Sequence, residues 1–178
     1  MSWLDNIDAA AAKKGPKVET FWQFVKFIVV SLGACIVQVV SLAILYNIPA
    51  IKELSTQAFA WWVFHYPVIP GERCGLALFI SANVANILAQ IVAFFINKEK
   101  TFNSSANIAL TLPIYIIFTV ALIVFSAWLN PFSKGLLIEW GLSEALSKNI
   151  ATMICSSVQF FLYFPVDKIL FKKKKEEK

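Results

Sequence analysis

Long apolar stretches separated by short polar ones dominate this sequence. Four of these stretches are long enough to cross a membrane, since about 30 Å of hydrocarbon takes roughly 20 helical residues. Only helices and closed barrels satisfy the backbone in lipid, and the stretches lack the strict alternation of a strand. They therefore predict transmembrane helices over residues 21–46, 76–97, 108–129 and 149–171.

The segments outside these helices are short. Residues 1–20 are mixed and polar and predict a cytoplasmic segment, which could lie on the membrane surface as a helix broken at Gly15-Pro16. Residues 172–178 form a basic cytoplasmic tail. The loop between the first two helices holds Trp61, His65 and other aromatic residues, which suit an interfacial anchor or a lid. The predicted fold class is an all-α integral membrane protein with a four-helix bundle, spanning residues 21–171.

Composition and charge support this prediction. The chain of 178 residues is 58% hydrophobic and 15% charged, whereas a soluble domain is about half apolar and a quarter charged. Most of the 16 Lys and Arg residues lie before the first helix, between the second and third, and after the fourth. The positive-inside rule then places both ends in the cytoplasm. This bias accounts for the net charge of +5 without a nucleic-acid partner.

Candidate chemistry is sparse. The three cysteines show neither metal-ligand spacing nor a disulfide framework, and the single histidine has no acid or nucleophile near it in the sequence. The sequence therefore predicts no metal site, no cofactor and no enzymatic activity.

Polar side chains follow one face of several predicted helices. They recur at three- and four-residue intervals, which places them on one stripe of a helix. Such stripes either bridge packed helices or form a path for a hydroxyl-rich group, because carboxamides both donate and accept hydrogen bonds. Both interpretations stay open. The residues are Gln38 in the first helix, Asn83, Asn86 and Gln90 in the second, and Ser156, Gln159 and Tyr163 in the fourth.

Lysines cluster at the predicted cytoplasmic ends of the helices. Lys26 lies about one turn into the first helix, Lys98 and Lys100 follow the second, and Lys168 lies near the end of the fourth. Lysines at such positions anchor a helix at the interface. Alternatively, they form a basic ring that binds a phosphate headgroup.

A weak internal repeat relates the second and fourth helices. Residues 92–95 and 158–161 both read Val-x-Phe-Phe, and the polar-Lys pairs Asn97-Lys98 and Asp167-Lys168 follow them. The pattern is consistent with two helix hairpins of the same topology. Internal repeats are common in transporters, whose sites lie at the repeat interface.

These motifs give the chain a family resemblance. Residues 95–102, Phe-Ile-Asn-Lys-Glu-Lys-Thr-Phe, resemble the Asn-Arg/Lys-x-x-x-Phe signature of the GtrA-like family, and residues 24–27 resemble its Phe-x-Arg-Phe opening. Residues 167–171 resemble a second copy of the signature. The family consists of small four-helix membrane proteins and includes a subunit of dolichol-phosphate mannose synthase. Lys26 departs from the commoner arginine, which weakens a bidentate phosphate contact.

The resemblance implies a role in cell-surface glycosylation at the bacterial cytoplasmic membrane. Its members are thought to translocate polyprenyl-phosphate-linked sugars. The implied phosphate-binding residues are Lys26, Asn97, Lys98, Lys100 and Lys168, and the polar stripes would pass the sugar. Four helices enclose little volume, so a homodimer or a complex with a glycosyltransferase is expected.

Two other functions fit the same pattern. The chain could be a non-transporting membrane subunit that anchors a glycosyltransferase or presents lipid to it. It could also be a small multidrug-type exporter, although the glutamate typical of the first helix of those proteins is missing. Asp167 lies at an inner edge and no acidic residue lies centrally, which argues against a proton-coupled exporter.

Overall fold

The structure is a computed structural model that describes residues 3–172, so most of the predicted basic tail lies outside the described residues. Its four long helices are α2 (Pro16–Tyr46), α4 (Gly75–Ile96), α5 (Ile108–Glu139) and α6 (Glu144–Leu170). Each is long and apolar enough to cross a membrane. The prediction of an all-α, multi-pass membrane protein is confirmed.

The helices extend beyond the predicted apolar segments. α2 begins at Pro16 instead of residue 21, because proline suits the first turn of a helix, where its missing N–H is not needed. α5 continues through Pro131 to Glu139 instead of ending at residue 129. α6 begins at Glu144 instead of residue 149. Apolar length marks only the part of a helix that crosses hydrocarbon.

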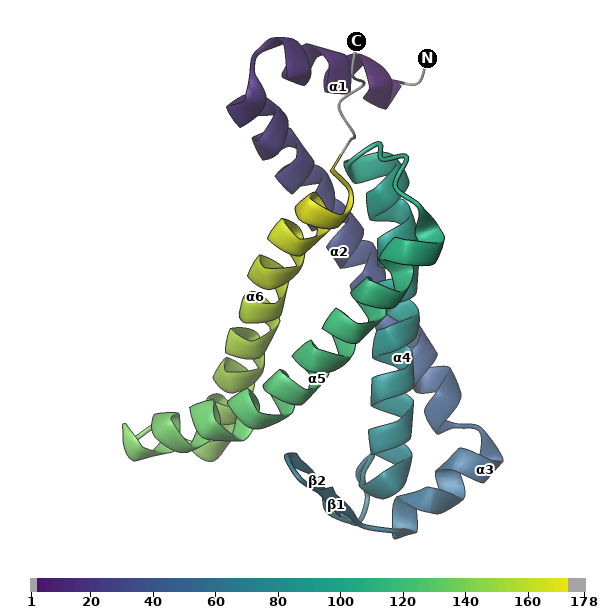
Figure 1. Cartoon of the computed structure of the whole chain (residues 1–178). Helices are drawn as coiled ribbons and strands as arrows, with labels where there is room; N and C mark the ends of the chain where they lie inside the picture. Colours follow the sequence, from purple (N-terminus) through teal and green to yellow (C-terminus); the bar gives the residue numbers. More distant parts are fainter. Residues whose placement is uncertain (1–2, 173–178) are drawn as a thin grey trace.

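The long helices form two hairpins, α2 with α4 and α5 with α6. In Figure 1, α6 approaches α2 near the top, whereas the outer turns of the two hairpins lie far apart at the bottom. We call the top the lysine-rich end, because Lys26, Lys98 and Lys168 lie there, and the bottom the opposite end. The short helix α1 (Trp3–Lys13) lies beside the start of α2 at the lysine-rich end (Figure 1).

A stripe of small residues joins α4 to α2. Every fourth residue of α4 from Ala77 to Ala93 is alanine or serine and is at most 5% exposed. Ala89 and Ala93 form a buried cluster with Ala34 of α2. Small side chains let two backbones approach closely, which is how helices associate in lipid, where no hydrophobic force drives them together.

Aromatic rings hold the two hairpins together at the lysine-rich end. Phe27 of α2 lies with ring centroids 5.1 Å from Phe160 and 5.4 Å from Phe164 of α6. Phe94 of α4 lies 5.1 Å from Phe171, directly after α6. The main buried cluster of the chain therefore lies near this end.

The loop between α2 and α4 is a compact outer cap. It contains α3 (Pro49–Lys52), the 3₁₀ turn η1 (Glu53–Thr56) and an antiparallel pair, β1 (Phe59–Trp61) and β2 (Phe64–Tyr66), in which Ala60 faces His65. Phe59 stacks on Phe79 of α4 with centroids 4.2 Å apart. Trp61 and Trp62 are more than half exposed, as interfacial aromatic residues often are.

Gly75 is the position where this cap depends on glycine. Its φ is +62°, and a Cβ there would lie 2.4 Å from the Gln57 carbonyl oxygen and 2.9 Å from that of Ser55. The adjacent Leu76 N–H donates to the same Gln57 oxygen at 2.8 Å.

We expect Gly75→Ala to raise tryptic cleavage at the exposed Arg73 at least about fivefold more than Gly71→Ala does, because its Cβ must displace the Gln57 and Ser55 carbonyl groups, which adds about 1–3 kcal/mol to the cost of the left-handed backbone. Gly71→Ala is the matched control, since its φ is also positive but its Cβ would meet nothing within 4 Å. Equal cleavage of the two variants would contradict the close approach at Gly75.

Candidate functional site

Two adjoining cavities lie between the hairpins and are lined by the predicted polar stripes. The outer cavity, of about 500 Å³, opens beneath β2 and is lined by Asn83 and Asn86 of α4. The inner cavity, of about 210 Å³, lies deeper and is lined by Gln90, Ser156 and Tyr163 among others. Gln38 of α2 and Gln159 of α6 line both cavities. All seven predicted stripe residues therefore line these two cavities, which together we call the polar path.

Hydrogen bonds hold several polar side chains of this path in place. One joins the two hairpins, and two others join α5 to α6. The Tyr115 hydroxyl of α5 donates to Oε1 of Gln90 at 2.9 Å. Gln159 Nε2 donates to the Ser126 hydroxyl at 2.6 Å, and the Tyr163 hydroxyl lies 3.1 Å from that of Thr119. Gln38 and Asn86 carry no such protein partner within the described residues. Their amides are thus available to a ligand.

Aromatic side chains and amide side chains line the outer cavity together. Tyr66 and His65 of β2 line it together with Asn83 and Asn130. Burial of the ring raises the pKa of the Tyr66 hydroxyl above its ordinary value, and a hydrogen bond with Asn83 offsets part of that shift. The hydroxyl therefore stays protonated at neutral pH and can both donate and accept.

The inner end of the path is closed by a buried polar triad. Asn97 Nδ2 donates to Asp167 Oδ2 at 2.8 Å, and the Thr101 hydroxyl donates to Asn97 Oδ1 at 2.8 Å. Asn97 begins a π-helical turn, η2 (Asn97–Thr101), whose closing bond runs from the Phe102 N–H to the Asn97 carbonyl. π turns are rare and often mark functional sites. The two polar residues of the repeat thus meet directly.

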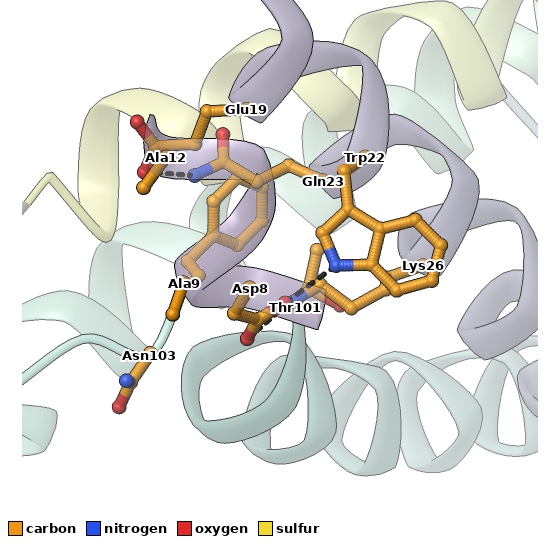
Figure 2. A pocket seen from close by; sticks show the side chains of 10 residues that line it. Asp8, Ala9, Ala12, Glu19, Trp22, Gln23, Lys26, Thr101 and Asn103 are labelled. Carbon is orange, nitrogen blue, oxygen red and sulfur yellow. Dashed lines mark hydrogen bonds and ion pairs between the residues drawn. The ribbon is translucent and has the colours of Figure 1, made fainter. Parts of the chain in front are cut away.

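Lys26 is engaged by the N-terminal helix. Its ammonium donates to the two carboxylate oxygens of Asp8 in α1 at 2.9 and 3.0 Å and to the Lys100 carbonyl at 2.6 Å. The Trp22 indole N–H donates to the same carboxylate. Figure 2 shows Asp8, Trp22 and Lys26 among the side chains that line a cavity here, whose volume is about 400 Å³. A phosphate would have to displace Asp8 to reach Lys26 in this conformation.

The other predicted phosphate ligands are spread around the lysine-rich end. Lys98 donates to the Ser104 carbonyl at 3.1 Å, and Lys100 is exposed. Lys168 donates to the Thr20 hydroxyl at 2.7 Å. Lys168 and Lys172 both line a surface cavity of about 290 Å³. Asn97 is not at this surface, because its amide is buried against Asp167 and Thr101.

Sequence reasoning missed two acidic residues at the site. Asp8 was counted only as part of a polar segment, and Asp167 was placed at an inner edge, whereas its side chain is 0% exposed. A signal existed for Asp167, since the repeat pairs it with Asn97. Nothing in the sequence pattern links Asp8 to Lys26.

The chain was compared with protein-family models, with curated proteins and with solved structures, and none of the three comparisons finds a match.

Proposed function

We propose that this protein translocates a polyprenyl-phosphate-linked sugar across the bacterial cytoplasmic membrane for glycosylation of the cell surface. The observation that carries the proposal is the neutral polar path between the hairpins, in which Gln38 and Gln159 join two cavities. The resemblance of residues 95–102 to the GtrA-like signature supports the same role.

The lining of the path suits a sugar. Carboxamides and hydroxyls donate and accept hydrogen bonds without net charge, as sugar hydroxyls require. Aromatic rings at the mouth, including Tyr66 and His65, offer flat apolar faces beside those amides. The lining of the two cavities includes no Asp, Glu, Lys or Arg among the described residues. A cationic drug would find no ionised partner there.

The lysine-rich end suits the phosphate. Lys168 and Lys172 line one surface cavity together with Thr20 and Glu19. Lys100 is exposed in η2. Such ammonium groups bind phosphate oxygens as point charges. In the proposed cycle the phosphate first binds at the lysine-rich end, and the sugar enters the polar path. The phosphate then follows the sugar to the other leaflet, while the polyprenyl chain remains in lipid.

The test is leaflet exchange in liposomes that contain the purified protein. We expect a labelled polyprenyl-phosphate sugar to exchange between leaflets faster than in protein-free liposomes. Polyprenyl phosphate without the sugar is the control and should exchange more slowly, because it cannot fill the amide-lined path. No acceleration by the protein would contradict transport. Capture of a glycosyltransferase by an inactive protein would favour the anchoring subunit instead.

A further inference from the structure

We propose that Asp167 is a proton-binding site whose protonation holds the two hairpins together at the lysine-rich end. The role that we give this site, coupling a proton to the movement of the hairpins during transport, rests on the proposed function. The site itself is defined by buried side chains and not by any bound sugar.

The first observation is the poor hydration and pairing of the carboxyl group. The Asp167 side chain is 0% exposed, and Oδ2 accepts one hydrogen bond from the Asn97 amide. The other oxygen, Oδ1, is buried and has no hydrogen-bond partner among residues 3–172. An ionised carboxylate in such a place loses far more hydration than a single amide donor replaces. A protonated carboxyl fits, because the proton resides on Oδ1 and Oδ2 remains an acceptor.

The second observation is that no cation among residues 3–172 forms an ion pair with Asp167. Within residues 3–172, the ion pairs are those of Lys26 with Asp8 and Lys134 with Glu144. Lys98 from η2 donates to Ser104, and Lys168, the neighbour of Asp167 on α6, donates to Thr20.

In the described part of the chain, the remaining titratable groups that interact with Asp167 are phenols. The side chains of Tyr115 on α5 and Tyr163 on α6 both interact electrostatically with Asp167. Phenols are neutral at physiological pH. The charge of Asp167 is therefore set by its own proton and by the access of water.

The third observation is the place of this carboxyl in the fold. Asp167 lies on α6 and its partner Asn97 ends α4, so their hydrogen bond joins the two hairpins at the end where they converge (Figure 1). Phe94 and Phe171, which lie about one helical turn from Asn97 and Asp167, are buried with their ring centroids 5.1 Å apart. Asn97 also lines the inner cavity. Opening this contact would connect the path with the lysine-rich surface.

These observations define a two-state element. With the proton on Oδ1, the closed contact is favoured. When the hairpins separate, water reaches Asp167, and the proton leaves to the solution at the lysine-rich end. Ionised Asp167 then favours the open form, because closing would bury its charge. Because the closed form binds one more proton than the open form, the ratio of open to closed forms rises by up to about tenfold for each pH unit.

The experiment measures the distance between the hairpins without any substrate. Spin labels are placed at Phe21→Cys on α2 and Ile169→Cys on α6, two exposed positions at the lysine-rich end, in a background without Cys35, Cys74 and Cys155. The distribution of distances between the two spin labels is recorded by double electron–electron resonance in lipid nanodiscs, at a series of pH values from acidic to alkaline. We expect a short distance at acidic pH and a longer population that grows as the pH rises.

Asp167→Asn is the decisive variant, because it keeps the shape and the acceptor for Asn97 but cannot ionise. It should show the short distance at every pH. Glu144→Gln, which removes an exposed carboxylate at the other end of α6, should follow the wild type. A pH-independent wild type, an Asp167→Asn variant with the wild-type response, or a response to sodium in place of pH would overturn the proposal.

A second measurement covers the case in which Asp167→Asn does not fold. Infrared spectra of the wild type should show the band of a protonated carboxyl at acidic pH, and the band should disappear over the same pH range as the distance change. Absence of that band at acidic pH would overturn the proposal. Because neither measurement needs a sugar lipid, a failure of the proposed function would leave both results unchanged.

Discussion

Replacing both Gln38 and Gln159 by leucine is expected to slow leaflet exchange of a polyprenyl-phosphate sugar at least about tenfold. Both amides line the outer and the inner cavity, so in the proposed cycle the sugar passes between them. Leucine removes the donors and acceptors while keeping a similar volume. A buried hydroxyl left without a partner costs about 1–3 kcal/mol, and about 1.4 kcal/mol corresponds to a tenfold change in rate.

The measurement is the liposome exchange assay with equal amounts of folded protein. Gln57→Leu is the matched control, since Gln57 is exposed in the outer cap and lines neither cavity. We expect this control to exchange lipid at the wild-type rate. Wild-type exchange by the double variant would show that the polar stripes only join helices.

Replacing Ala89 by leucine is expected to have the largest effect on stability. Ala89 is 1% exposed and packs with Ala93 against Ala34 of α2. A leucine side chain has no room there without moving one helix. Overpacking costs about 1–3 kcal/mol, which lowers the midpoint of thermal unfolding by roughly 2–12 °C for a chain of this size.

Thermal unfolding in detergent, followed by circular dichroism or size-exclusion chromatography, measures this effect. Val92→Leu adds the same kind of side chain on the same helix, but Val92 is 38% exposed on the lipid side. It should unfold at the wild-type temperature. If Ala89→Leu also unfolds there, α2 and α4 do not depend on close backbone contact.

Much of the candidate site could be predicted from the sequence because its residues obey helical periodicity. Asn83, Asn86 and Gln90 recur on one face of α4, and that face lines the cavities. The alanine and serine residues at every fourth position of α4 were an equally readable signal for close packing and were overlooked. Periodicity identifies a face, but it does not say which helix the face meets.

The roles of the charged residues could not be predicted in this way. Lys26 was expected at a phosphate site, yet its ammonium binds Asp8 of α1, and that contact depends on the turn at Gly15, whose φ is +106°. The Asn97–Asp167 bond joins residues that are 70 positions apart. Such pairs depend on how separate helices dock, and no local pattern encodes that.

The sequence by itself therefore determined the four apolar helices and the polar face on three of them, because hydrocarbon thickness and the helical repeat act locally along the chain. Only the tertiary structure decided that these faces meet in one path, that α1 covers Lys26, and that Asp167 is buried between the hairpins. Burial and charge pairing arise from the contact of distant segments, so the chemistry of this site appears only once the hairpins are packed together.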